Sequence, residues 1–302
     1  MEVTRRVFLR SAFGAVLAAL GGCAAHDRSL LRCPTALSEF ELDDDLGPLP
    51  VYRYKAGSGP VLVLLHELPG LSLSDLALAK CLAQQGFAVY LPLLFGEAGQ
   101  ERFFMGYFQS CATAEFDCSS LSGPSPILIR LREVCGKIIE RTGGSIGIIG
   151  MCLTGTFPLA LLREGVSAAV LCQPTRPFNP FFMRPVGAQK QALGLAQSDI
   201  ERARQFDLPF LALRYKSDRL CPRERFQTLR EQFPGRMAAI EIDGEPQGHS
   251  TLAGDLNEDA FADAAVYLKT RLGLSKKAAK MRLARFDDRP CEITPEGRWR
   301  AL

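Results

Sequence analysis

Short apolar stretches alternate with amphipathic ones along most of the chain. The apolar stretches are continuous runs of Val, Ile, Leu and Ala, which are typical of strands buried on both faces of a sheet. The segments between them repeat apolar residues at helical spacing. The sequence predicts strands at 51–54, 60–67, 87–94, 145–151, 166–174, 208–215 and 237–244. It predicts helices at 74–86, 126–144, 154–165, 222–233 and 257–273. Strands that alternate with helices form βαβ units, so we expect an α/β fold: a mostly parallel, doubly wound sheet with helices on both faces.

Two long segments and the end of the chain break this rhythm. The segments at about 95–125 and 175–205 are long for loops of a compact domain, so we expect two cap-like insertions. We place the folded domain at 49–273. Residues 274–302 carry eight Lys or Arg against four acids, which predicts a solvated, poorly ordered basic tail.

The first residues have the layout of an export signal. Arg5 and Arg6 precede an uncharged stretch, 11–22, that is too short to span a bilayer. The arginine pair resembles a twin-arginine signal, which exports folded protein. "LGGC" resembles a lipobox that ends at Cys23, the residue that would carry the lipid and anchor the protein to the membrane. A simple secretory peptide cut near 24–25 is the alternative. Either route predicts a periplasmic or cell-envelope protein.

Residues 23–48 are expected to be a tether between this signal and the domain. Their sequence includes "ELDDDLGPLP", which is acidic and interrupted by Pro and Gly, so it is a poor candidate for packing.

Composition narrows the partners and cofactors. A formal net charge of +3 gives no reason to expect nucleic acid as a partner. The stretch "GIIGMCLTG", 147–155, lacks the glycine spacing of a dinucleotide fingerprint and the lysine of a phosphate loop. With no Cys-x-x-Cys pair or His/Cys cluster in the sequence, we expect neither cofactor nor metal. The spacings of the ten cysteines leave the disulfide pairing open, with Cys111 and Cys118 the first pair to test.

The same stretch fits a third pattern, the nucleophile elbow between a strand and a helix. Gly150 stands two residues before Cys152, as the pattern requires. Two residues after Cys152 stands Thr154 rather than glycine, and Gly155 comes next. A buried structural cysteine is the alternative, because cysteine is among the most buried residue types.

Two later residues favour the elbow. In acyl transfer on this fold the chain order is nucleophile, acid, base. Asp218 lies just past one predicted strand and His249 a few residues past the next. His249 is also the only histidine after Cys152, so the order holds without a choice among candidates. The sequence therefore predicts a catalytic triad of Cys152, Asp218 and His249.

These motifs resemble the dienelactone hydrolase family of α/β-hydrolases over about 50–272. The resemblance rests on "LLHELPGL", "GMCLTG", "KSDRLCP" and "GHS". That family uses a cysteine in place of serine, with Asp and His as partners. The resemblance also implies a role for Glu67 in "HELPG": in the family this carboxylate meets the resting thiol and helps generate the thiolate when substrate binds. A buried carboxylate merely paired with an arginine is the alternative for Glu67.

The expected activity is hydrolysis of carboxylic esters or lactones through a thioester. His249 would take the thiol proton while Asp218 orients the imidazole, and Cys152 would attack the carbonyl carbon. The backbone N–H groups of Leu68 and Leu153 are expected to bind the oxyanion. A catalytically silent envelope scaffold that binds a ligand, and an acyltransferase that uses the same thioester, remain the alternatives.

The acyl group is expected to be neutral or apolar. The family's name-giving substrate is a lactone whose carboxylate is held by arginines. In this chain no cation follows His249 in "GHSTLAG", and the arginine nearest to the other expected position is Arg102, inside the first insertion. A buried carboxylate without a paired cation is costly, so such a substrate should fit badly.

Overall fold

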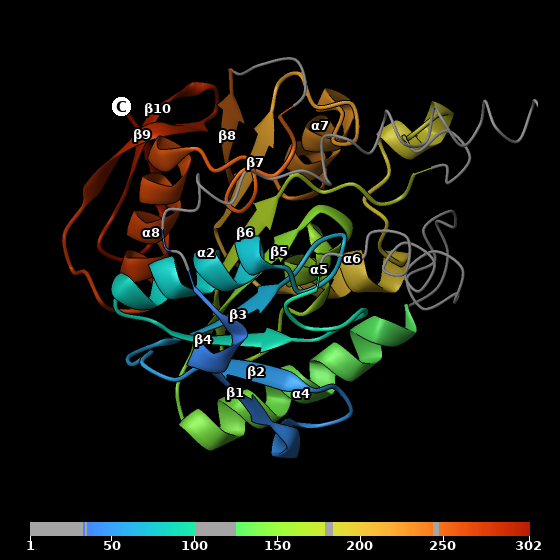
Figure 1. The fold of residues 1–302 in the computed structure, drawn as a ribbon. Helices are drawn as coiled ribbons and strands as arrows, with labels where there is room; N and C mark the ends of the chain where they lie inside the picture. The colour runs from blue at the N-terminus through green and yellow to red at the C-terminus, as the bar shows by residue number, and fades with distance from the viewer. Residues whose placement is uncertain (1–32, 34, 101–124, 179–183, 244–247) are drawn as a thin grey trace, which may run out of the picture.

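The computed structural model describes residues 33, 35–100, 125–178, 184–243 and 248–302 (Figure 1). The predicted export signal, Cys23, Arg102 and the pair Cys111 and Cys118 lie outside these residues. Within the described part of the chain, no helix combines the length and the apolar character that a membrane span requires.

The described residues form an eleven-stranded sheet in the order β1-β2-β4-β3-β5-β6-β7-β8-β9-β10-β11. The central strands run from β4 through β3, β5, β6 and β7 to β8, and neighbouring strands in this series pair in parallel. They are β3 (Val61–Leu65), β4 (Ala88–Pro92), β5 (Ile146–Met151), β6 (Val166–Cys172), β7 (Phe210–Tyr215) and β8 (Met237–Ile242). Antiparallel strands flank them: β1 (Phe40–Asp43) and β2 (Val51–Tyr54) on one side, and β9 (Ala279–Phe286), β10 (Arg289–Ile293) and β11 (Trp299–Ala301) on the other.

Helices cover both faces of the sheet (Figure 1). One face carries α2 (Leu73–Gln84) and α8 (Glu258–Arg271). The other carries α4 (Pro126–Thr142), α5 (Phe157–Ala160), α6 (Gln197–Gln205) and α7 (Arg223–Gln232). Strand β3 shows why its sequence is a continuous apolar run: Val63 faces the α4 side, Leu64 faces the α2 side, and both are fully buried. The predicted α/β fold class is confirmed.

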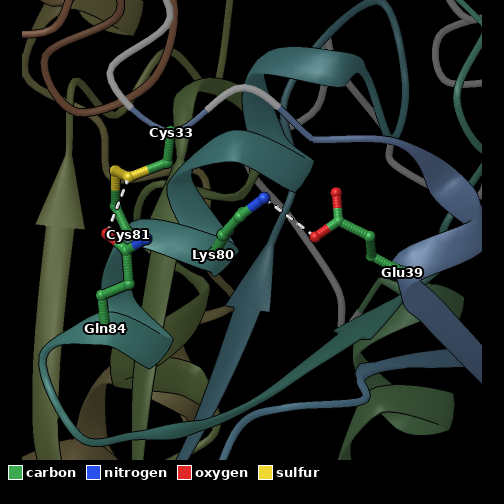
Figure 2. The surroundings of a disulfide bond; sticks show 5 residues. All are labelled: Cys33, Glu39, Lys80, Cys81 and Gln84. Carbon is green, nitrogen blue, oxygen red and sulfur yellow. Dashed lines mark hydrogen bonds and ion pairs between the residues drawn. A yellow bond between two sulfur atoms is a disulfide. The ribbon is translucent and has the colours of Figure 1, made fainter.

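The expectation of an unpacked tether is wrong from Cys33 onward. Turns η2 (Leu37–Glu39) and η3 (Asp44–Leu46) enclose β1, which pairs with β2 and buries Phe40. A disulfide joins Cys33 to Cys81 on α2 (Figure 2). The acidic composition was misleading because the acids meet cations on the folded body. Glu39 Oε2 lies 2.9 Å from Lys80 Nζ beside the disulfide, and Asp43 Oδ2 lies 2.5 Å from a nitrogen of Arg141.

The expectation of a disordered basic tail at 274–302 is also wrong, because β9, β10 and β11 extend the sheet. Alternation explains the difference: within the strands, most apolar side chains point inward, while most basic ones remain exposed or pair with acids. Met281 and Trp299 are buried, whereas Arg282 binds Asp259 at 2.6 Å on the surface. A count of charges along the segment cannot detect this alternation, because successive side chains of a strand point to opposite faces.

The second expected insertion, at about 175–205, packs onto the core in the part that the structure describes. Between β6 and β7 lie η5 (Gly187–Lys190) and α6, and buried apolar side chains of this segment join the core. Arg225 on α7 fixes the segment, because its fully buried guanidinium donates to the carbonyl oxygens of Pro174, Gln189 and Ala192 at 2.6–2.8 Å. The helix predicted at 154–165 shortens to α5, preceded by the turn η4 (Cys152–Thr154).

Candidate active site

The predicted site residues lie at the carboxyl ends of the parallel strands. Glu67 follows β3 and Cys152 follows β5, while Asp218 and His249 lie in the loops after β7 and β8. Carboxyl ends of parallel strands meet at one edge of a sheet, where ligands commonly bind. The fold therefore brings all four side chains to one place.

Cys152 occupies the tight elbow that its neighbours predict. Its φ is 51°, a left-handed value that is uncommon for a residue other than glycine, Asn or Asp. A Cβ on Gly150 would lie 2.2 Å from the Thr154 carbonyl oxygen, and one on Gly155 would lie 2.5 Å from Pro174 Cα. Both approaches are shorter than any side chain tolerates, so glycine is required at both positions.

Thr154, the departure from the elbow pattern, has a structural use. Its hydroxyl accepts from the Met151 N–H at 2.9 Å and lies 3.1 Å from the carbonyl oxygen of Leu65, the last residue of β3. The elbow after β5 is thus tied to the strand that leads into Glu67. Gly155, one position later, gives the close approach that the pattern assigns to glycine.

His249 is oriented by Asp218. The Nδ1 of His249 lies 2.8 Å from Asp218 Oδ2, and both side chains are buried. Asp218 is itself held, since its Oδ1 accepts from the Leu220 N–H at 2.8 Å. A carboxylate acceptor assigns the proton to Nδ1. This leaves the buried Nε2, which has no hydrogen-bond partner among the described residues, as the nitrogen available for proton transfer.

The charge balance around His249 favours imidazolium. Burial by itself lowers the pKa of His249, but the Asp218 carboxylate and an ionised Cys152 outweigh it and raise the pKa well above its usual value. Arg225 remains a cation below the site, although burial lowers its pKa to about 10. A site with these charges suits a thiolate–imidazolium pair.

The thiol lies among hydrogen-bonding groups. Cys152 Sγ, a carboxylate oxygen of Glu67 and a ring nitrogen of His249 are all within 4.8 Å of one another. The Thr175 hydroxyl lies 3.3 Å from the sulfur. A buried Cys/His/Glu trio is also a donor set that Zn²⁺ accepts. From the sequence, these three residues come together as catalytic groups and not as metal ligands.

Both carboxylate oxygens of Glu67 are engaged. Oε1 accepts a short hydrogen bond from the Ser250 hydroxyl, and Oε2 accepts from Gln173 Nε2 at 3.1 Å. The Gln173 carbonyl oxygen Oε1 in turn accepts from the Thr251 hydroxyl at 2.6 Å and from the Thr251 N–H at 3.2 Å. Among the described residues, the side-chain partners of Glu67 are therefore neutral, and the arginine considered from sequence is not one of them.

Two buried acid–base groups lie next to the site without joining it. His66 accepts from the Leu94 N–H through Nε2 at 3.0 Å, its Nδ1 lies 3.1 Å from the Glu67 carbonyl oxygen, and burial lowers its pKa to about 4. It is thus a neutral strut between the loops after β3 and β4. Asp75, in the first turn of α2, has a pKa raised to about 8, mainly by burial and then by the charge of Glu67.

The expected oxyanion donors occupy suitable positions along the chain. Leu68 directly follows Glu67, and Leu153 directly follows Cys152 in the buried turn η4. Both belong to loops at the carboxyl edge of the parallel strands, where the other predicted site residues lie. Their role as oxyanion donors stays a prediction.

Sequence reasoning missed the supporting residues Gln173, Thr175 and Ser250. A usable signal existed, because polar residues stand just beyond the end of an apolar run in "SAAVLCQPT" and just beyond His249 in "GHS". Their partners, however, lie in other loops, and only the fold brings these loops together.

Comparisons with known proteins identify the family of the chain and its fold. The model of the dienelactone hydrolase family matches residues 50–278. No curated protein matches the chain significantly. Among solved structures, a protein from Klebsiella pneumoniae designated a dienelactone hydrolase aligns with a TM-score of 0.52 and 16% identity, over 75% of this chain and 93% of that one. A bromoperoxidase from Bacillus anthracis aligns at 0.45 with 13% identity, covering 69% and 92%. An esterase from Exiguobacterium antarcticum aligns at 0.43 with 16% identity, covering 67% and 90%.

Proposed function

Because the chain belongs to the dienelactone hydrolase family and is thus a hydrolase of carboxylic ester bonds, we propose that Cys152 is its nucleophile and that a thioester is its intermediate. The observation that carries this proposal is the elbow cysteine with φ 51°, buried within 4.8 Å of a histidine that Asp218 orients. A structural cysteine needs neither the strained backbone nor the aligned base.

The reaction proceeds from the thiolate–imidazolium pair, in which His249 Nε2 has taken the proton of the Cys152 thiol. The sulfur attacks the ester or lactone carbonyl carbon, and the N–H groups of Leu68 and Leu153 receive the developing negative charge. When the carbon–oxygen bond breaks, the leaving oxygen takes the proton from His249. Water then attacks the thioester, His249 accepts its proton, and release of the acid restores the thiol.

Alkylation of the cysteines tests the nucleophile directly. Burial raises the pKa of Cys135, Cys221 and Cys291 to about 12 and also raises the pKa of Cys172, so these thiols should react slowly. After a short iodoacetamide pulse, peptide mass spectrometry should find the label on Cys152 first. A pulse of an activated ester should leave an acyl group on the same residue. Equally slow labelling of all buried cysteines would indicate a silent scaffold, and transfer to an added alcohol faster than to water would indicate an acyltransferase.

We also propose that the substrate carries a neutral or apolar acyl group. The support is the neutral environment of Glu67: Ser250, directly after His249, and Gln173 occupy its oxygens. Matched esters with and without a free carboxylate test this, with kcat/KM as the measurement. A preference for the carboxylated ester that is lost in Arg102→Ala would contradict the proposal.

A further proposal concerns location: we infer that the protein is exported and held to the envelope by lipid on Cys23. Two features support it, the layout of residues 1–23 and the Cys33–Cys81 disulfide, since such bonds persist in oxidising compartments. In cells fed a fatty-acid probe, the parent should be labelled and membrane-bound, and Cys23→Ala should be neither. Arg5→Lys with Arg6→Lys should block export. Equal probe incorporation into parent and Cys23→Ala would rule out the lipid site.

A further inference from the structure

Gln173 links three loops of the site through one side chain. It directly follows β6 and is fully buried. Its Nε2 donates to Glu67 after β3, and its Oε1 accepts twice from Thr251, two residues beyond His249. Because Oε1 faces two donors, the amide orientation is determined, and Nε2 must be the group that faces the carboxylate.

The backbone of Gln173 is as constrained as its side chain. Its φ is 33°, so Gln173 joins Cys152 as a buried non-glycine residue in the left-handed region. Its N–H donates to the Leu213 carbonyl oxygen on β7 at 2.7 Å. Its own carbonyl oxygen lies 3.2 Å from the Thr175 hydroxyl, the group that also contacts the nucleophile sulfur. The conformation thus places the amide toward Glu67 and the Thr175 hydroxyl toward Cys152.

Ser250 completes the arrangement from the histidine loop. Its hydroxyl donates to Glu67 Oε1 and accepts from the Gly254 N–H at 3.0 Å. Asp255 fixes the same loop by accepting from the N–H groups of His249 and Ser250 at 2.9 and 3.2 Å. Glu67, with a donor on each oxygen, can rotate only if both bonds break.

From these contacts we propose that Gln173 is a positioning residue that clamps Glu67 beside the thiol and keeps the histidine loop in register with it. This inference rests on the proposed function and deepens it. Glu67 is then a fixed anion at the nucleophile in the free enzyme, rather than a side chain that awaits a cation brought together with the substrate. Because the clamp keeps this carboxylate from moving closer to the sulfur, formation of the Cys152 thiolate requires no cation on the substrate.

Two substitutions at Gln173 separate this role from a merely structural one. Gln173→Met keeps the length and bulk but removes every side-chain hydrogen bond. We expect kcat to fall about 10- to 100-fold, the loss typical of one hydrogen bond to a charged group, with KM changed less than about threefold. The pH midpoint of Cys152 alkylation should move upward, because a released carboxylate can approach the sulfur and disfavour the thiolate.

Gln173→Glu supplies the sharper test. When protonated, the carboxyl group that this substitution introduces can donate to Glu67 and still accept from Thr251, whereas its ionised form places two anions together. The activity of this variant relative to the parent should therefore rise as the pH falls from 8 to 5, whereas the ratio for Gln173→Met should not rise at low pH. This low-pH rescue is a signature that loss of packing alone does not produce.

Tyr267→Phe is the matched control. Tyr267 is also fully buried and bonded to β6: its hydroxyl accepts from the Ala169 N–H at 3.0 Å and donates to the Pro209 carbonyl oxygen at 2.8 Å, away from the site. It should lower the melting temperature without changing kcat or the alkylation midpoint. If Gln173→Met does not fold, Gln173→Glu at pH 5 carries the test.

The clamp is overturned if Gln173→Met has the same kcat and the same alkylation profile as the parent. It is also overturned if the activity of Gln173→Glu relative to the parent does not depend on pH. Alkylation requires no substrate, so it tests the clamp even if the parent hydrolyses no ester. Failure of the proposed function is seen separately, as activity that persists in Cys152→Ala.

Discussion

The carboxyl edge of the parallel strands and the antiparallel flanks of the same sheet differ in the kind of side chain that they bury. At the edge, the groups that face inward are polar and buried, and two buried non-glycine residues, Cys152 and Gln173, hold left-handed backbone angles, whereas the two on the flank, Asp287 and Asp288, are exposed in the turn between β9 and β10. On the flanks, most inward groups are apolar, as with Phe40 and Trp299, and most charges lie outside, while the buried Glu292 pairs with Arg300. Buried polar groups and strain cost stability, whereas apolar burial provides it. The flanks should therefore maintain the fold in which the edge performs chemistry, and changes in the two regions should affect different measurements.

The largest effect should follow from a change at the edge. Asp218→Asn keeps the shape of the side chain but can present an amide N–H to His249 Nδ1, which favours the tautomer with the proton on Nε2. That nitrogen then cannot accept the thiol proton, so kcat should fall about 10⁴-fold, as in other triads. The melting temperature should change little.

Asp243→Asn is the control for this change. Asp243 lies just after β8 and pairs on the surface with Lys216 at 2.8 Å. Its substitution should leave kcat unaltered. If Asp218→Asn retains most of the parental kcat, Asp218 does not orient the base and the contrast between edge and flank fails at its strongest point.

A change on the C-terminal flank should lower the stability of the fold and leave kcat unchanged. The Trp299 ring stacks on Tyr267, with centroids 5.4 Å apart, and its Nε1 donates to the Phe210 carbonyl oxygen at 3.2 Å. Trp299→Ala should cost about 3–5 kcal/mol of unfolding free energy, because it leaves a cavity and a lost hydrogen bond. Urea unfolding measures this cost, and kcat below the transition should equal that of the parent. Arg298→Ala, which removes only a surface ion pair with Asp207, should cost less than about 1 kcal/mol.

The same contrast explains what the sequence could predict. The parallel strands were recognisable because burial on both faces leaves continuous apolar runs, and Asp218 and His249 were recognisable because each stands just beyond such a run. Strands β1, β10 and β11 were missed because they are short and half-exposed, and β9 was missed because it is half-exposed although it has eight residues, so their charges dominate any local average. Glu39 and Arg282 looked like solvent-exposed charges of disordered ends, yet each has a partner that only the fold supplies.

The clamp was missed for a different reason. A glutamine after a strand is not a typical catalytic group. The role of Gln173 depends on its hydrogen bonds to Glu67 and Thr251, which are distant in sequence. The cysteine pairing was equally hidden, because no spacing rule joins Cys33 to Cys81. Residues whose role is intrinsic to their type were predictable, and residues whose role depends on a partner were not.

The N-terminal flank should contribute through its disulfide. The Cys33–Cys81 bond closes a loop with a sequence separation of 48, and removal of such a bond typically costs about 2–4 kcal/mol. Cys33→Ser with Cys81→Ser should lower the urea midpoint by a corresponding amount at unchanged kcat. Reductant should destabilise the parent in the same way and have no further effect on the double variant. A loss of kcat at full stability would show that this flank is coupled to the site.

The smallest effect should come from Asp75, which lies between the two regions. It is fully buried in the first turn of α2, where its Oδ2 accepts from the N–H and hydroxyl of Ser72, and its pKa is raised to about 8 by burial and then by Glu67. The unfolded chain has the ordinary aspartate pKa of about 4, so between pH 4 and pH 8 the folded protein binds the extra proton. Stability from this group is thus fully present below pH 4 and is lost as the pH rises through about 8, with a slope of at most about 1.4 kcal/mol per pH unit.

Asp75→Asn removes this titration and keeps an acceptor for Ser72. Its unfolding free energy relative to the parent should therefore increase by about 1–2 kcal/mol between pH 6 and pH 8, measured by urea unfolding at each pH. Ser74→Ala, a buried neighbour in the same turn, should shift stability equally at both values. In a Glu67→Gln background the gain should shrink, because one cause of the raised pKa is gone. A gain that is the same with and without Glu67 would show that the charge at the edge does not reach α2, and the two regions would then be electrostatically independent.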